Sequence, residues 1–135
     1  MPKQVIHVPS APTVGATPGQ AGSPVAQAIR FGNMLFVSGQ GAVDPATGAV
    51  VAGDIATQTR LALDNLMRIL NAAGATPKNI VNMRVTLRDT ADFPAFNETL
   101  RHYFGGEKVT RTCFGGVPNR AGINLQIDCV ATFGA

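Results

Sequence analysis

Five polar side chains of types that can do chemistry are predicted to share one face of a β-sheet. They are Arg84, Arg111, Cys113, Gln126 and Asp128. In the strand that contains Arg111 and Cys113, the neighbouring residues could take this face instead. An arginine fork can bind a carboxylate through two parallel hydrogen bonds, and a cysteine can act as a nucleophile when a histidine activates it. No histidine can be placed near Cys113, so a nucleophilic role has little support. A face this mixed could equally be a solvated sheet surface, and both interpretations stay open.

The composition indicates one domain that buries part of its surface in an oligomer. The chain has 135 residues, which suits a single domain with one modest core. Hydrophobic residues make up 45% and charged residues only 14%. About a quarter of the residues in a typical soluble domain are charged, so this chain has too few charges to cover a fully exposed surface. We therefore expect part of its surface to be buried in a homo-oligomer.

Charge and cysteine patterns argue against nucleic-acid, metal and membrane roles. The net charge is +3, the basic residues are scattered and aromatic residues are few. Cys113 and Cys129 lack a C-x-x-C spacing, and His7 and His102 are isolated, so we expect no metal site. The first residues lack a signal-like apolar region, and no apolar run is long enough to span a membrane. We therefore expect a cytoplasmic protein with free thiols, with organelle targeting left open.

The pattern of apolar residues predicts an α+β domain. Two apolar runs flank Gly32-Asn33, which can supply the positive φ angles of a tight hairpin turn. The clearest helix covers 54–73, where Asp54 can cap the start and Gly74 can take the left-handed conformation at the end. The other expected elements are a strand at 3–8, a loop at 9–24, a turn at 44–48, a strand at 80–87, a helix at 91–104 and strands near 109–117 and 122–133. The two helices should cover one face of a mostly antiparallel sheet.

Four segments, taken together, resemble the Rid (YjgF-type) family of imine/enamine deaminases. They are GNMLFVSGQGAVDPATGAVV, TRLALDNLMRILNAAG, VTLRDTADFPAFNETLRHYF and TRTC, and the similarity runs from about Val25 to Phe133. The resemblance implies one chorismate-mutase-like domain over residues 1–135, with an N-terminal strand and extended loop at 1–24. It also implies a homotrimer whose sheets form a central barrel, with three active sites at the subunit clefts.

The resemblance implies that the protein hydrolyses reactive imines and enamines to a 2-keto acid and ammonia without a cofactor. Catalysis requires holding the substrate carboxylate, placing a water and moving protons. The resemblance assigns the carboxylate to Arg111 and the backbone N–H of Cys113, and it places Ser38, Gly39 and Asn97 at the cleft. The alternatives are a structural ion pair for Arg111 and a helix-surface role for Asn97.

The chain departs from the family pattern around the predicted pocket. Gln126 stands where the deaminases carry a glutamate, and a glutamine can hydrogen-bond a water but cannot take its proton. Asp128 lies on the same face, but its side chain would start about 7 Å away along the strand. Val25 stands where a tyrosine often closes the pocket, and Phe114 precedes two glycines beside the arginine. These differences predict a wider, less polar pocket.

Two functions of different class follow from this pattern. The first is a deaminase for a bulkier 2-imino acid or enamine, in which Arg111 binds the carboxylate and Gln126 orients the water. The substrate nitrogen or Asp128 would then handle the protons. The alternative is a non-catalytic trimer of the same family that binds a small carboxylate, and a different reaction in a specialised pathway is a weaker third. The loop before Val25 could cover a site, although a frayed arm fits better.

Overall fold

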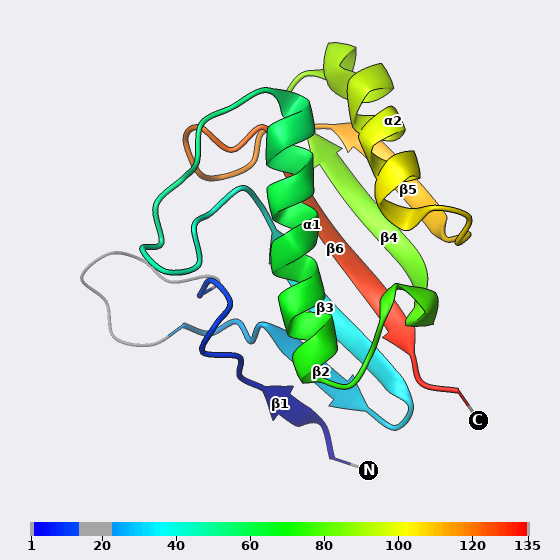
Figure 1. Cartoon of the computed structure of the whole chain (residues 1–135). Helices are drawn as coiled ribbons and strands as arrows, with labels where there is room; N and C mark the ends of the chain where they lie inside the picture. The colour runs from blue at the N-terminus through cyan, green and yellow to red at the C-terminus, as the bar shows by residue number, and fades with distance from the viewer. Residues whose placement is uncertain (1, 14–22, 135) are drawn as a thin grey trace.

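Two α-helices cover one face of a six-stranded sheet (Figure 1). The computed structural model describes residues 2–13 and 23–134. Its elements are β1 (Gln4–Ile6), β2 (Ala28–Phe31), β3 (Met34–Gln40), α1 (Ile55–Ala72), the 3₁₀ helix η1 (Pro77–Asn79), β4 (Ile80–Leu87), η2 (Thr90–Asp92), α2 (Phe93–Phe104), β5 (Thr110–Gly115) and β6 (Leu125–Thr132). The strand order is β1-β2-β3-β6-β4-β5, and β4–β5 is the parallel pair in an otherwise antiparallel sheet. The predicted α+β architecture is therefore confirmed.

Helix α1 forms where its apolar stripe predicts. The Asp54 side chain accepts a hydrogen bond from the Thr57 N–H at 2.8 Å, and Gly74 ends the helix region with a φ of 87°. The stripe is fully buried against the sheet, with side chains such as Leu63, Leu66 and Leu70 in the core. Burial of this stripe fixes which face of the sheet lies under the helices.

The two predicted turns are present, with one difference in detail. The hairpin joins Phe31 to Met34, but Gly32 alone supplies a positive φ (61°) there, and Asn33 does not. The turn at 44–48 is closed by a hydrogen bond from the Gly48 N–H to the Asp44 carbonyl at 2.8 Å. Most of the loop predicted at 9–24 lies outside the described residues.

The face of the sheet away from the helices carries only part of the polar set predicted for it. Gln126 and Asp128 do lie there, and Arg84 pairs with Asp128 in the register of β4 and β6. Of the two alternatives predicted for β5, the neighbours Thr112 and Phe114 lie on this face, beside Arg84 and Thr86, whereas Arg111 and Cys113 do not. The register sets Arg111 beside Met83 and Cys113 beside Val85, both of which are fully buried under the helices. Side-by-side residues in a sheet point to the same face, so Arg111 and Cys113 lie on the helix side.

An apolar row crosses the open face at the other end of the sheet. The registers place Val5 beside Ile29, Ile29 beside Phe36, and Phe36 beside Val130. Val5 is 61% exposed and Phe36 is 45% exposed.

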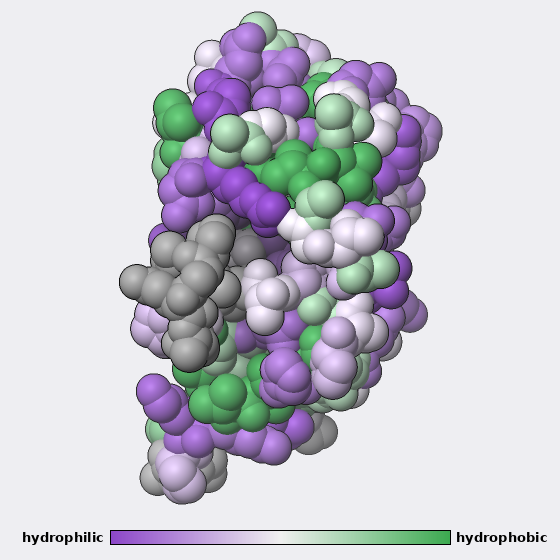
Figure 2. Space-filling view, turned by 90° about the vertical axis from the view of Figure 1, so that its left-hand side faces the viewer, coloured by the Kyte–Doolittle hydropathy of each residue, from purple (hydrophilic) through white to green (hydrophobic). Residues whose placement is uncertain are grey.

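On the side of the molecule drawn in Figure 2, hydrophobic residues gather in two separate patches among hydrophilic ones. Among the described residues, no helix has the length and apolar character needed to cross a bilayer.

Candidate active site

Arg111 is held in place by helix α2. Its Nη1 donates a hydrogen bond to Asn97 Oδ1 at 2.7 Å. Its guanidinium carbon lies 5.3 Å from the centre of the Phe93 ring and 5.6 Å from that of Phe96, within the range of cation–π attraction. Within residues 2–13 and 23–134 no carboxylate forms an ion pair with this arginine. Since a guanidinium has five N–H donors, most of the fork remains available for an anion.

Cys113 presents its backbone rather than its thiol. Strand β5 is the last strand of the sheet, and the Gly116 N–H donates to the Leu87 carbonyl at 2.9 Å. Hydrogen bonding alternates along a strand, so the Cys113 N–H points away from β4, toward the free edge. The thiol is half-buried against the core, and this burial raises its pKa, although nearby Arg111 acts in the opposite direction. A raised pKa disfavours the thiolate that a nucleophile needs.

Gln126 lies in a second cluster, against a bulge of β3. The register between β3 and β6 shifts between Val37 and Gln40. A Cβ on Gly39 would lie 2.0 Å from Gln126 Nε2, so the glutamine side chain occupies the space that glycine leaves. Next to it, Ser38 Oγ donates to the Ala26 carbonyl at 2.6 Å. The sheet therefore brings three predicted site residues together: Ser38, Gly39 and Gln126.

Sequence reasoning missed the residue that holds this second cluster to the N-terminal segment. Gln27 is buried, its Oε1 accepts from the Val8 N–H at 2.6 Å, and its Nε2 donates to the carbonyls of Val8, Ala11 and Pro12. Its own carbonyl accepts from the Ser38 N–H at 2.9 Å. The available signal was a lone glutamine inside the apolar run VAQAIRF. We call these hydrogen bonds between Gln27 and residues 8–12 the Gln27 clasp. Val25, two residues before Gln27, is 45% exposed.

The two clusters lie on opposite faces of the sheet, so one chain does not join Arg111 to Gln126. Asp128 is not free to replace a missing base, because its Oδ1 lies 3.1 Å from Arg84 Nε in an ion pair. Phe114 is half-exposed on the open face, where it approaches Gly116. The predicted pocket residues are thus divided between a helix-side group and an open-face group.

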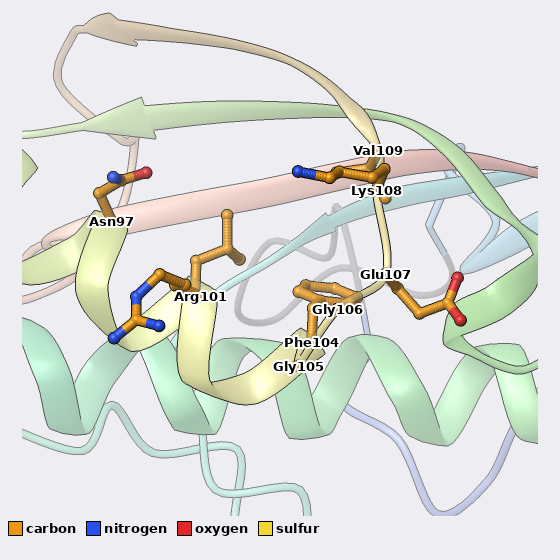
Figure 3. A pocket seen from close by; sticks show the side chains of 9 residues that line it. Asn97, Arg101, Phe104, Gly105, Gly106, Glu107, Lys108 and Val109 are labelled. Carbon is orange, nitrogen blue, oxygen red and sulfur yellow. The ribbon is translucent and has the colours of Figure 1, made fainter.

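A cavity that the sequence did not predict adjoins the helix-side group. It has a volume of about 230 Å³, and it lies between the C-terminal half of α2 and the segment leading into β5 (Figure 3). Asn97, the partner of Arg111, forms one end of its wall. Among the described residues, no group of three or more His, Cys, Asp or Glu side chains could hold a metal ion.

Comparisons with known proteins place these groups in context. The model of the family described as Endoribonuclease L-PSP matches residues 16–133. A RutC family protein of Pyrococcus horikoshii is 41% identical over 108 residues, covering 80% of this chain and 86% of that protein. The 2-iminobutanoate/2-iminopropanoate deaminase of Homo sapiens is 34% identical over 117 residues, covering 87% of this chain and 85% of that protein. The crystal structure of E. coli TdcF with bound serine superposes with a TM-score of 0.84 at 31% identity, covering 97% of this chain and 99% of that one.

Proposed function

The chain belongs to the endoribonuclease L-PSP family, which is the YjgF/Rid family, and on that premise we propose that it is an imine deaminase. It hydrolyses a 2-imino acid or its enamine tautomer to a 2-keto acid and ammonia. The observation that carries the proposal is the state of Arg111. Its guanidinium is positioned by Asn97 and two phenylalanine rings, has no ion-pair partner among the described residues, and lies on the same side of β5 as Cys113.

The substrate carboxylate binds the Arg111 fork and the edge N–H of Cys113 in this proposal. Water then attacks the imine carbon, the C–O bond forms, and the substrate nitrogen takes a proton from the water. When the C–N bond breaks, the remaining hydroxyl proton moves to nitrogen and ammonia leaves. Gln126 orients the attacking water, because its amide can donate and accept but cannot act as a base. Hydrolysis changes no oxidation state, so the proposed reaction needs no redox cofactor, and no step of it is assigned to a metal.

We propose that a homotrimer completes the site. Arg111 lies on one face of the sheet and Gln126 on the other, so the two can meet only when the β5 edge of one chain approaches the Gln126 cluster of another. The exposed apolar row containing Val5 and Phe36 supports burial of the open face between copies.

A second candidate function, carboxylate binding without catalysis, is supported by the lack of a free base in the open-face group. Asp128 is paired with Arg84, and Gln126 is neutral, so the open-face group lacks a free carboxylate base. This favours a trimer that binds a small carboxylate without turning it over. A nucleic-acid role has less support, because arginines such as Arg84, Arg88 and Arg120 already bind protein acceptors.

An imine-hydrolysis assay separates the two functions. An amino-acid oxidase generates 2-imino acids in situ, from alanine-sized to phenylalanine-sized, and semicarbazide competes for the imine. We expect the protein to accelerate imine loss, Arg111→Ala to abolish the acceleration, and Arg68→Ala, on the exposed side of α1, to leave it unchanged. Acceleration that survives in Arg111→Ala contradicts the assigned site. No acceleration with any imino acid, together with Arg111-dependent binding of keto acids, establishes the binding function instead.

A further inference from the structure

We propose that the cavity beside Asn97 receives the side chain of the substrate and selects one that ends in a second carboxylate. This inference rests on the proposed function, because it takes Arg111 as the site of the first carboxylate. It adds a substrate class, the 2-imino dicarboxylic acids.

The cavity adjoins the Arg111 group through Asn97. Asn97 both accepts the hydrogen bond of Arg111 and lines the cavity. Val109, another lining residue, lies two positions before Arg111 at the start of the same edge. A ligand whose carboxylate sits on Arg111 therefore has the cavity as the adjoining space for its chain.

The walls suit a short aliphatic chain. Leu100, Phe104 and Val109 supply apolar surface, and all three belong to the core or contact it. Ligand pockets for drug-sized molecules run to about 300–1,000 Å³, so a volume of about 230 Å³ fits a smaller molecule. Apolar walls alone would favour a hydrophobic substrate side chain. The charged residues at the rim of the cavity therefore decide whether the substrate side chain is apolar or charged.

Those charges point to an anion. The Lys108 side chain extends along the cavity toward the Asn97 end, whereas Glu107 points away from it (Figure 3). Lys108 forms no ion pair within the part of the chain that the structure describes. Arg101, the other cation of the wall, is already held by Glu98 at 2.5 Å. Lys108 is thus the rim charge left for a ligand.

The spacing between the two cations fits a dicarboxylate. Two residues, Val109 and Thr110, lie between Lys108 and Arg111, so an extended chain would separate their Cα atoms by about 10 Å, and the Lys108 side chain reaches across part of that distance toward Asn97. Two carboxylates joined by a short aliphatic chain can then meet both charges. A monocarboxylate of the same length would leave Lys108 hydrated.

Calorimetric titration with two keto acids tests this without depending on turnover. The probes are 2-oxoglutarate and 2-oxopentanoate, which have the same carbon count and differ in the distal carboxylate. We expect the wild-type protein to bind 2-oxoglutarate roughly three- to fivefold more tightly, as a partly exposed ion pair allows. Lys108→Met should remove this preference and Lys108→Arg should retain it. Lys78→Met, a remote exposed lysine, should also retain it.

The outcomes separate this inference from the proposed function. Equal affinities in the wild type, or an unchanged preference in Lys108→Met, overturn the dicarboxylate pocket while Arg111-dependent binding still supports the carboxylate site. Binding of neither acid, or binding of both that survives Arg111→Ala, overturns the carboxylate site and this inference with it. Screening in 1 M NaCl should also remove the preference, because the selecting charge is exposed.

Discussion

Gly39 and Gln126 share one small space in the sheet. A Cβ on Gly39 would lie 2.0 Å from Gln126 Nε2 and 2.8 Å from its Cδ, closer than non-bonded atoms approach. The two residues meet where β3 bulges against β6. The missing side chain at position 39 therefore sets where the glutamine amide lies, and with it the water that this amide is proposed to orient.

Replacing Gly39 by alanine should act on catalysis through Gln126. We expect Gly39→Ala to lower kcat roughly ten- to a hundredfold, because a displacement of about 1 Å at a reacting group has effects of this size. In a Gln126→Ala background the same change should have almost no effect. Steady-state kinetics of the four proteins of this double-mutant cycle measure the coupling. Additive losses would show that the two residues act independently.

Gln126→Glu should raise the activity on small imines. A carboxylate at this position can take a proton from the attacking water, and general-base catalysis is worth about 10² or more. The gain should be present at neutral pH and fall as the pH drops through the pKa of the new carboxyl group, near 4.3 for an unperturbed glutamate. The imine-loss assay across pH measures it, with Gln126→Met as the control. Equal activity in Gln126→Glu and the parent would show that the missing carboxylate at position 126 does not limit the hydrolysis of small imines.

Asn97→Ala should weaken substrate binding through Arg111. The hydrogen bond at 2.7 Å fixes the guanidinium, and hydrogen bonds to charged groups are worth about 1.5 kcal/mol, so KM should rise roughly tenfold with a smaller change in kcat. Asn97→Asp should raise KM further, because its carboxylate competes with that of the substrate. Asn71→Ala, on the exposed end of α1, is the matched control. A fall in kcat with KM unchanged would assign Asn97 a different role.

Mixed trimers test whether the two clusters meet between chains. Arg111→Ala and Gln126→Ala should each be nearly inactive alone. The two variants are unfolded together in equal amounts and refolded. A site then combines the intact Arg111 of one chain with the intact Gln126 of its neighbour in about a quarter of cases, so about a quarter of the activity should return. The same treatment of each variant alone is the control. No recovery, with heterotrimers shown by mass spectrometry, would mean that the halves are not shared between chains.

Gln27→Ala should destabilise the fold. The buried side chain serves one N–H and three carbonyls of residues 8–12, and its loss leaves buried backbone groups unsatisfied. We expect the free energy of unfolding to fall by about 2 kcal/mol or more, measured by urea denaturation at fixed protein concentration. Gln4→Ala, at an exposed residue of β1, should change it by less than about 0.5 kcal/mol. Equal values for both variants would contradict the clasp.

The elements of the fold were within reach of the sequence because their signals are local. The stripe of α1, its Asp54 cap and the hairpin at Gly32 depend on residues a few positions apart, and all three are present. The Gly39–Gln126 contact and the Gln27 clasp join residues far apart in the chain. No local pattern contains them.

Local patterns in the chain predict the order of helices and strands, the buried side of α1 and the family to which the segments around Arg111 belong. The positions of Arg111 and Cys113 under the helices and the ion pair of Asp128 with Arg84 follow only from the folded arrangement of the strands. The reason is the two-residue period of a strand. A change of one residue in the register of β4 and β5 moves every side chain to the other face, and that register is set by packing between strands rather than by either strand alone.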